Sequence, residues 1–347
     1  MQSIVIGIAG TAKNTGKTTT TRAIMEQVIK DKNIVLGLTS IGYDGEDIDN
    51  ITGLPKPKIE VWPGVVIAVA EKCLKVSTAK IEILEATNIL TPLGKIILGK
   101  VVGAGRLLVA GPNKSKELRQ ILFLLRRYSA NFIIVDGALN RIAPMVEVDG
   151  LIIATGAART PDIKKLAQET RNIVEILQLP VVTVANDSAY MDCVLDSETV
   201  KKLVETFDKH KSIDINGIIS TKSFEDLLAA GDKINGKRLI FSDAIKLLVC
   251  GEINNIYNLF TKLKDKNLEI SVKKSIDVIA ITINPYYPQF RFSSDDYTEA
   301  YVDKDELNKA IKGNVRVPVY DVVKEGGEKL YIDILNYWNK VNKLTAK

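Results

Sequence analysis

Short apolar runs without charge alternate along the chain with longer segments whose apolar residues recur at helical spacing. Residues 3–9 (SIVIGIA) are rich in β-branched side chains and carry no charge, as a central parallel strand buried on both faces would. Residues 17–30 follow without proline, and Ile24 and Val28 share one face of the helix that this segment predicts. The alternation predicts an α/β fold built on a mostly parallel, doubly wound sheet.

The same alternation continues to the end of the chain. Strands are expected where apolar runs stand between turn residues, and helices where the apolar period lengthens. The predicted strands are residues 33–42, 131–136, 151–155, 181–185, 215–220, 238–241, 277–283 and 315–320. The predicted helices are residues 113–127, 162–177, 196–209, 254–266 and 329–341.

Two regions interrupt this pattern. Residues 51–112 hold several short apolar runs, two of them around a Pro63-Gly64 turn, and no linker-like composition. After about residue 230 the pattern loosens between glycine-containing turns. We therefore expect one α/β domain at residues 1–230 with a β-rich insertion at about 51–112, and a small C-terminal α/β domain at residues 231–347.

Residues 10–18 (GTAKNTGKT) join the first strand to the first helix and have the composition of a P-loop, so residues 1–230 are expected to form a P-loop NTPase domain. A loop wrapped around a polyphosphate points backbone N–H groups inward, and a helix N-terminus adds partial positive charge. Gly16 lets the backbone approach closely, Lys17 supplies the charge for the β- and γ-phosphate oxygens, and Thr18 supplies a hydroxyl for Mg²⁺. The alternative is a strand-to-helix turn that contains Gly-Lys-Thr without binding phosphate.

This motif departs from its usual spelling, because Thr11 stands where the common motif has its first glycine and Gly10 lies one residue earlier. The ligands expected for this loop are ATP and Mg²⁺, with GTP left open. The residues predicted to contact the nucleotide here are Gly10, Thr11, Lys13, Asn14, Thr15, Gly16, Lys17, Thr18 and Thr19.

Two carboxylates are candidates for the metal side of this site. Asp136 ends the apolar run 131–136 and is followed by glycine, as in a Walker B strand, so it can bind a water of the Mg²⁺ shell beside Thr18. Asp44 belongs to an acidic stretch that follows the predicted strand 33–42, at the sheet edge where such folds keep their ligands. The alternative for Asp136 is a strand that simply ends in an Asp-Gly turn, and the alternative for Asp44 is a solvated acidic turn. Lys17, Asp44 and Asp136 are the predicted catalytic residues, and Thr18, Asp44 and Asp136 the predicted metal ligands.

Three further residues follow predicted strands and carry suitable chemistry. Asn140 and Arg141 come shortly after Asp136 and either contact phosphate or serve an unrelated surface role. Asn186 ends the run 181–185, where many P-loop proteins recognise the base, although a short polar turn explains it equally well.

Composition narrows the classes of function. The 347 residues carry a net charge of only +5, spread among nearly as many acids, which gives no electrostatic case for nucleic acid. The three isolated cysteines predict buried thiols in a reducing cytoplasm rather than disulfides or a zinc site. The N-terminal apolar run has no basic region before it and is too short for a bilayer, so no membrane association is expected.

The spelling Gly-Thr-x-x-x-x-Gly-Lys-Thr resembles the dethiobiotin synthetase and cobyrinate amidase branch of P-loop proteins. Some relatives there use a second lysine, five residues before the invariant one, to reach across a dimer. Lys13 lies four residues before Lys17, and a homodimer is left open. An amidase that uses glutamine needs a nucleophilic Cys paired with a His, and the single His210 has no such partner motif.

Four segments together resemble a narrower family, the reactivase subunits of lysine 5,6-aminomutase. They are Asn14-Thr15-Gly16-Lys17-Thr18-Thr19, Thr39-Ser40-Ile41-Gly42-Tyr43-Asp44-Gly45-Glu46, Asp136-Gly137-Ala138-Leu139-Asn140-Arg141 and Thr282-Ile283-Asn284-Pro285. The resemblance implies an ATPase that works with a MutS-like ATPase subunit to restore an adenosylcobalamin-dependent aminomutase whose cofactor has been damaged.

Three classes of function follow from these observations. In the first, nucleotide binding and hydrolysis drive a conformational cycle that acts on a partner protein. In the second, the γ-phosphate activates a small molecule, as in ligases of the dethiobiotin synthetase or cobyrinate synthase type. In the third, the fold binds nucleotide without hydrolysis, since no residue can be named as orienting the attacking water.

Overall fold

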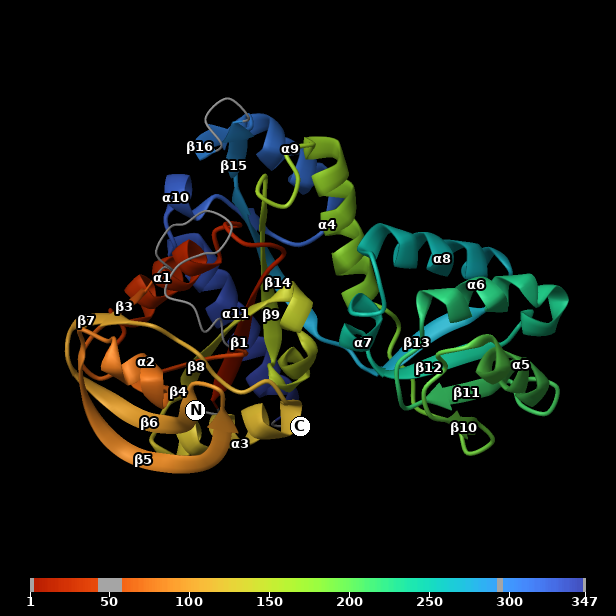
Figure 1. Cartoon of the computed structure of the whole chain (residues 1–347), viewed down its shortest axis with the longest axis horizontal. Helices are drawn as coiled ribbons and strands as arrows, with labels where there is room; N and C mark the ends of the chain where they lie inside the picture. The colour runs from red at the N-terminus through yellow and green to blue at the C-terminus, as the bar shows by residue number, and fades with distance from the viewer. Residues whose placement is uncertain (1–2, 43–57, 292–295, 346–347) are drawn as a thin grey trace. The chain divides into compact units, whose positions relative to one another are not determined.

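The computed structural model describes residues 3–42, 58–291 and 296–345 of the chain, which fall into two compact units (Figure 1). Unit 1 comprises Met1–Ala167 and Val278–Lys347, and unit 2 comprises Gln168–Asp277. These bounds differ from the predicted division at residue 231. The run that begins near residue 277 forms a strand of the unit 1 sheet, so the chain returns to its first unit instead of building a separate C-terminal domain.

Unit 1 contains, among its described residues, a nine-stranded sheet in the order β17-β14-β9-β1-β8-β2-β4-β6-β5. Strand β1 (Ile4–Gly10) is buried along its whole length and pairs in parallel with β8 (Phe132–Ala138) and β9 (Gly150–Gly156). The charge-free run at the N-terminus is therefore a central parallel strand, as its composition predicted. Further parallel pairings join β8 to β2 (Leu36–Ser40), β2 to β4 (Val66–Ala70) and β14 (Asp277–Asn284) to β17 (Val319–Tyr320).

Helices of unit 1 cover this sheet. The indole ring of Trp338 in α11 lies edge-on to Phe132 in β8, with ring centroids 5.9 Å apart, and α11 also packs against α1. Both aromatic side chains are fully buried, so they form a large part of the core. The helices are α1 (Lys17–Val28), α2 (Glu71–Lys75), α3 (Ser115–Arg127), α4 (Ile163–Leu177), α9 (Lys304–Asn314), α10 (Val322–Glu325) and α11 (Glu328–Thr345); the boundary between the units falls inside α4.

The predicted β-rich insertion does form strands, but most of them extend the main sheet. Strand β6 (Gly94–Gly103) pairs antiparallel with both β4 and the edge strand β5 (Lys80–Thr91). The two strands around Pro63-Gly64 do not pair with each other, because β3 (Ile59–Val61) pairs instead with β7 (Gly105–Leu107).

Near the C-terminal end of unit 1 the segment after Asn284 is also extended. Strand β15 (Tyr286–Arg291) pairs antiparallel with β16 (Asp296–Tyr301). Tyrosine and phenylalanine side chains face each other across this ribbon, which favours the extended conformation despite Pro288.

Unit 2 has a smaller parallel sheet among its described residues, in the order β10-β11-β12-β13. Its aromatic core includes Phe224, whose ring centroid lies 6.5 Å from that of Phe241 and 5.2 Å from that of Phe260. The strands are β10 (Ala189–Met191), β11 (Ser212–Ile215), β12 (Arg238–Asp243) and β13 (Glu269–Lys274). The helices are α5 (Ser197–Thr206), α6 (Thr221–Ala229), α7 (Ile245–Leu248) and α8 (Ile253–Asp265).

Two predicted strands of this unit are wrong. Residues 181–185 make only an isolated bridge, between Val181 and Val272, and the strand expected at 215–220 lies earlier, at β11. Within the described ranges, no helix combines the length and the apolar character that a bilayer span requires.

Candidate functional site

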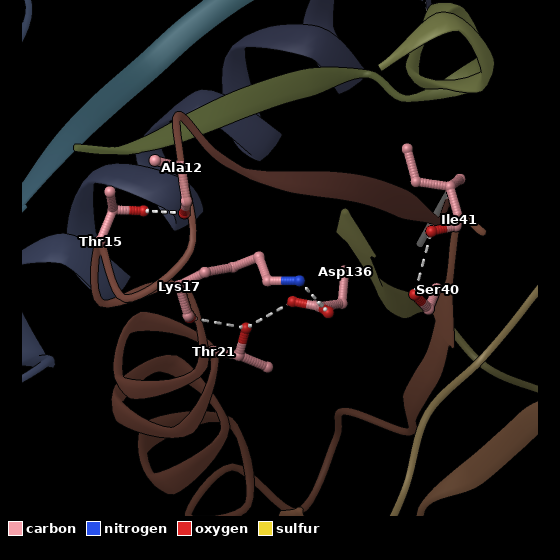
Figure 2. Close-up of polar contacts among 7 residues, drawn as sticks. All are labelled: Ala12, Thr15, Lys17, Thr21, Ser40, Ile41 and Asp136. Atoms are coloured by element: carbon pink, nitrogen blue, oxygen red, sulfur yellow. Dashed lines mark hydrogen bonds and ion pairs between the residues drawn. The ribbon is translucent and has the colours of Figure 1, made fainter. Parts of the chain in front are cut away.

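The loop of residues 10–18 leaves β1 and enters α1, and its own hydrogen bonds fix its course. The Thr11 N–H donates to the Ala154 carbonyl at 2.9 Å, and the Thr11 hydroxyl lies 3.1 Å from that of Thr155, which attaches the start of the loop to β9. Further along, the Thr15 hydroxyl donates to the Ala12 carbonyl at 2.9 Å (Figure 2). These hydrogen bonds hold the loop in a defined conformation.

Two loop residues have left-handed backbone conformations, Asn14 with φ of 61° and Gly16 with φ of 87°. Such residues, alternating with right-handed ones, turn successive N–H groups toward a common centre and form an anion-binding concavity. Glycine is favoured at position 16 by this conformation, and a Cβ atom added there would lie 3.3 Å from Asn284 Cβ, which would have to shift slightly. The amide nitrogen of Asn284 also donates to the Asn14 carbonyl at 2.8 Å, which holds the loop from its other side.

Helix α1 starts without the usual satisfaction of its first N–H groups. Gly16 occupies the N-cap position, no side chain among the described residues caps the helix, and its first turn carries no acidic residue. The N–H groups of the first turn of a helix have no partners within the helix, and together with the helix dipole they favour an anion. The start of α1 therefore suits a phosphate group.

A carboxylate faces this helix start from the neighbouring strand. Asp136 in β8 accepts a hydrogen bond from Lys17 Nζ at 2.7 Å, and Thr21 Oγ1 lies 3.5 Å from its other oxygen (Figure 2). Thr21 Oγ1 also lies 3.1 Å from the Lys17 carbonyl oxygen. The Asp136 side chain is only 10% exposed, against 28% for Lys17, so the pair lies at the floor of the site and is shielded from most of the solvent.

These groups line one cleft of about 700 Å³, a volume typical of small-molecule sites. Among its described lining residues the cleft has four cations and one carboxylate, Asp136. Lysine and arginine side chains on a concave surface suit the oxygens of a polyanion such as a polyphosphate. The four cations are Lys13, Lys17, Arg141 and Arg159.

All nine predicted loop contacts line this cleft, and so do Asp136, Asn140 and Arg141. Asn186 does not join them: it belongs to unit 2, where it is exposed after a segment that forms no strand. Asp44, the other predicted acid, lies outside the described residues. The residues predicted from the sequence thus make up most of the site that the structure describes, and contact between Asn186 and the base stays a prediction.

The structure adds four cleft or loop residues that the sequence did not assign. Arg159 and Tyr286 line the cleft, Asn284 lines it and contacts the loop, and Thr155 contacts Thr11. Arg159 follows β9 and Asn284 ends β14, both at the sheet edge where the loop lies. Arg159 and Asn284 could have been predicted only from knowing that the strand at 277–283 lies next to the strand at 151–155. No local sequence pattern gives this strand order.

The side chains present fit a magnesium ion that is bound together with a nucleotide. Mg²⁺ prefers oxygen ligands and takes only one or two from the protein when phosphates supply others. The Thr18 hydroxyl and the Asp136 carboxylate provide such oxygens in the same cleft. Among the described residues, no group of three or more acidic, cysteine or histidine side chains is arranged to hold a metal ion by itself.

The cysteines lie apart from this chemistry, because none of the three lines the cleft. Cys73 is buried, as expected, and burial raises the pKa of its thiol to about 11. Cys250 is half-buried, and burial likewise raises its pKa to about 11, whereas Cys193 is exposed and departs from the expectation of buried thiols.

Comparison with known proteins gives little to set beside this geometry. No protein-family model matches the chain, and no curated protein matches it. One solved structure, titled "Structure of pNOB8 ParA bound to nonspecific DNA", matches 76% of this chain and 98% of its own at 12% sequence identity, with a TM-score of 0.26. We draw no conclusion from a likeness at that level.

Proposed function

We propose that this protein is a P-loop ATPase that binds a magnesium nucleotide and acts on a partner protein. One observation carries the proposal. A single cleft with four cationic side chains brings together the uncapped start of α1, the loop with its two left-handed residues, Lys17 and Asp136. An isolated strand-to-helix turn has no need of Asp136 beside its lysine, so the bare turn is the poorer explanation.

Each group has a definite role in this proposal. The loop N–H groups and the start of α1 hold the phosphates, and Lys17 neutralises charge on the β- and γ-phosphates. Thr18 and Asp136 hold Mg²⁺, which when bound neutralises the charge that develops as the γ-phosphoryl group is transferred. Arg141 lines the same cleft and is a further candidate for contact with the transferring phosphate.

The partner that we propose is an adenosylcobalamin-dependent lysine 5,6-aminomutase, reactivated together with a MutS-like ATPase subunit. This step rests on the resemblance of four short segments. Two of them meet at the loop, where Asn284 contacts Asn14, and the hydroxyl of Thr282 lies 2.7 Å from that of Thr20 beneath it. A change in the loop would therefore reach the segment that leads into β15.

A second candidate function is an ATP-dependent ligase for a small molecule. The observation that favours it is an apolar wall of the cleft on the Asp136 side, where an acceptor of the phosphoryl group would lie. Ile41 belongs to this wall, and its N–H donates to the Asp136 carbonyl at 2.8 Å. The other apolar members are Ile59, Leu108 and Val109.

The first test is binding of Mg-ATP, measured by calorimetry, in wild type and in Lys17→Ala. We expect the variant to lose about 100-fold in affinity, because a hydrogen bond to a charged group is lost. Since the alanine also removes the partner of Asp136, Lys17→Gln, which keeps an N–H donor, is measured beside it with a thermal melt. Lys72→Ala, at an exposed lysine outside the cleft, is the control. Equal affinity in wild type and both Lys17 variants would remove the P-loop assignment.

A second test separates the two candidate functions. The protein is used to capture partners from an extract of its native cells, with and without ATP. Recovery of an adenosylcobalamin-dependent aminomutase or a MutS-like ATPase, dependent on nucleotide, supports the partner function. Formation of a phosphorylated or ligated small molecule by the protein alone contradicts it and supports the ligase.

A further inference from the structure

Tyr286 is the one aromatic side chain among the described residues that line the cleft. It is half-buried, and its ring packs edge-on against Tyr301, with centroids 5.7 Å apart and planes at 67°. Its N–H donates to Asn284 Oδ1 at 3.2 Å, and the Asn284 amide donates to the Asn14 carbonyl at 2.8 Å. A short series of contacts therefore fixes the tyrosine relative to the phosphate-binding loop.

The order of strands shows which end of a nucleotide this ring would meet. Asp136 lies on β8, one strand from β1, whereas Tyr286 follows β14, two strands from β1 on the opposite side. Three strand spacings of about 4.8 Å separate β8 from β14, or about 14 Å in all. Asp136 would hold Mg²⁺ at the terminal phosphates, so it marks the γ-phosphate end of the cleft, and the nucleoside of a bound nucleotide would lie toward β14.

The apolar wall does not compete for the base, because it lies at the other end. Ile41 donates its N–H to the Asp136 carbonyl, which keeps this wall beside the γ-phosphate. At the β14 end, Arg159 supplies a positive charge and Tyr286 an aromatic face.

We propose that Tyr286 is the residue on which the base of the bound nucleotide stacks, an inference that rests on the proposed function. Stacking on an aromatic ring tolerates any base, because every base has a π-face. Tyr286 therefore raises affinity for the nucleoside without choosing between adenine and guanine. Asn284 is a positioning residue, since it ties the ring to the loop.

The experiment compares a nucleotide with the same phosphates lacking a nucleoside. Binding of Mg-ATP, Mg-GTP and inorganic Mg-triphosphate is measured for wild type, Tyr286→Ala and Tyr286→Phe. We expect the alanine variant to bind ATP and GTP about ten-fold more weakly, and triphosphate as wild type does. The phenylalanine variant should behave as wild type toward all three ligands.

Tyr287→Ala is the matched control, because it removes the neighbouring tyrosine of β15, which is not among the lining residues. An unchanged ATP affinity in Tyr286→Ala overturns the inference, and so does an equal loss for ATP and triphosphate, which would indicate damage to the loop. Wild type that binds neither ligand overturns the proposed function itself, and this inference with it.

Discussion

Unit 1 contains a mostly parallel sheet and unit 2 a smaller parallel one, yet only the sheet of unit 1 builds the cleft described above. In unit 1 the strand order reverses around β1, which has β8 on one side and β9 on the other. In unit 2 the strands follow one another in chain order, from β10 to β13, with no reversal. Ligands of open α/β sheets bind where the order reverses, because there the connections on the two sides diverge and leave a crevice. A parallel sheet alone does not make a site.

The helix starts differ in the same way. In unit 2, the side chains of Asp196, Ser220 and Glu252 accept hydrogen bonds from the first turns of α5, α6 and α8. The start of α1 in unit 1 has Gly16 instead and no side-chain cap among the described residues. The starts of α5, α6 and α8 are thus capped by side chains of unit 2, whereas the first N–H groups of α1 have no such cap. The comparison teaches that the absence of a cap, beside a lysine and a carboxylate, is the feature to look for.

The strongest way to sharpen this comparison is to neutralise one strand carboxylate in each unit. Asp136→Asn keeps an oxygen that can accept from Lys17 but removes a charge from the metal side. We expect ATP turnover to fall about 100-fold or more, with a much smaller change in ATP affinity, because the metal acts mainly on the charge developing in transfer. Steady-state phosphate release and calorimetry measure the two quantities.

The matched control is Asp214→Asn in β11 of unit 2. Asp214 is also paired with a lysine, since Lys273 Nζ lies 2.8 and 2.9 Å from its two oxygens. This variant should hydrolyse ATP at the wild-type rate. Equal losses from the two substitutions would mean that Asp136 acts through stability and not at the metal.

Much of the unit 1 site was predictable because its signals are local. A charge-free strand, a glycine-bounded loop and a helix follow one another within 28 residues, and each has its own period or turn chemistry. The apolar run before Asp136 is equally clear. Motif spacing was enough to expect Lys17 and Asp136 in one site, and they are 2.7 Å apart.

The unpredicted parts depend on contacts between distant segments. Asn284 and Asn14 are 270 positions apart, and nothing near either residue announces their hydrogen bond. The run 277–283 was recognised as a strand, but its place beside β9 follows from the packing of the whole sheet. The same reason explains the misplaced domain boundary, and the insertion whose strands joined the main sheet.

A smaller effect is expected from Gly16→Ala, which tests the shape of the loop. An alanine at a φ of 87° is strained by about 1–2 kcal/mol, and its Cβ presses on Asn284. If the loop relieves this strain by shifting, ATP should bind about ten-fold more weakly. Gly236→Ala is the control in unit 2, at a φ of 68° with its nearest neighbour 3.9 Å away. Gly236→Ala should lower the thermal midpoint and leave ATP affinity unchanged. A loss of ATP affinity in Gly236→Ala but not in Gly16→Ala would show that the loop does not hold the phosphates.

The smallest effect is expected from Asp196→Ala, which makes α5 of unit 2 resemble α1 by removing its cap. The Asp196 carboxylate accepts from the Thr199 N–H at 2.8 Å, and hydrogen bonds from Thr199 hold the pKa of Asp196 below its usual range. Because the folded pKa is lowered, this stabilisation is present above the unfolded pKa and is lost as the pH falls through the folded value. At pH 7 the variant should therefore melt a few degrees below wild type, and the difference should vanish well below about pH 4. ATP affinity should not change, since a helix start without a lysine and a carboxylate beside it is not a nucleotide site. If the difference in melting temperature between variant and wild type stays constant with pH, the carboxylate charge does not cap α5.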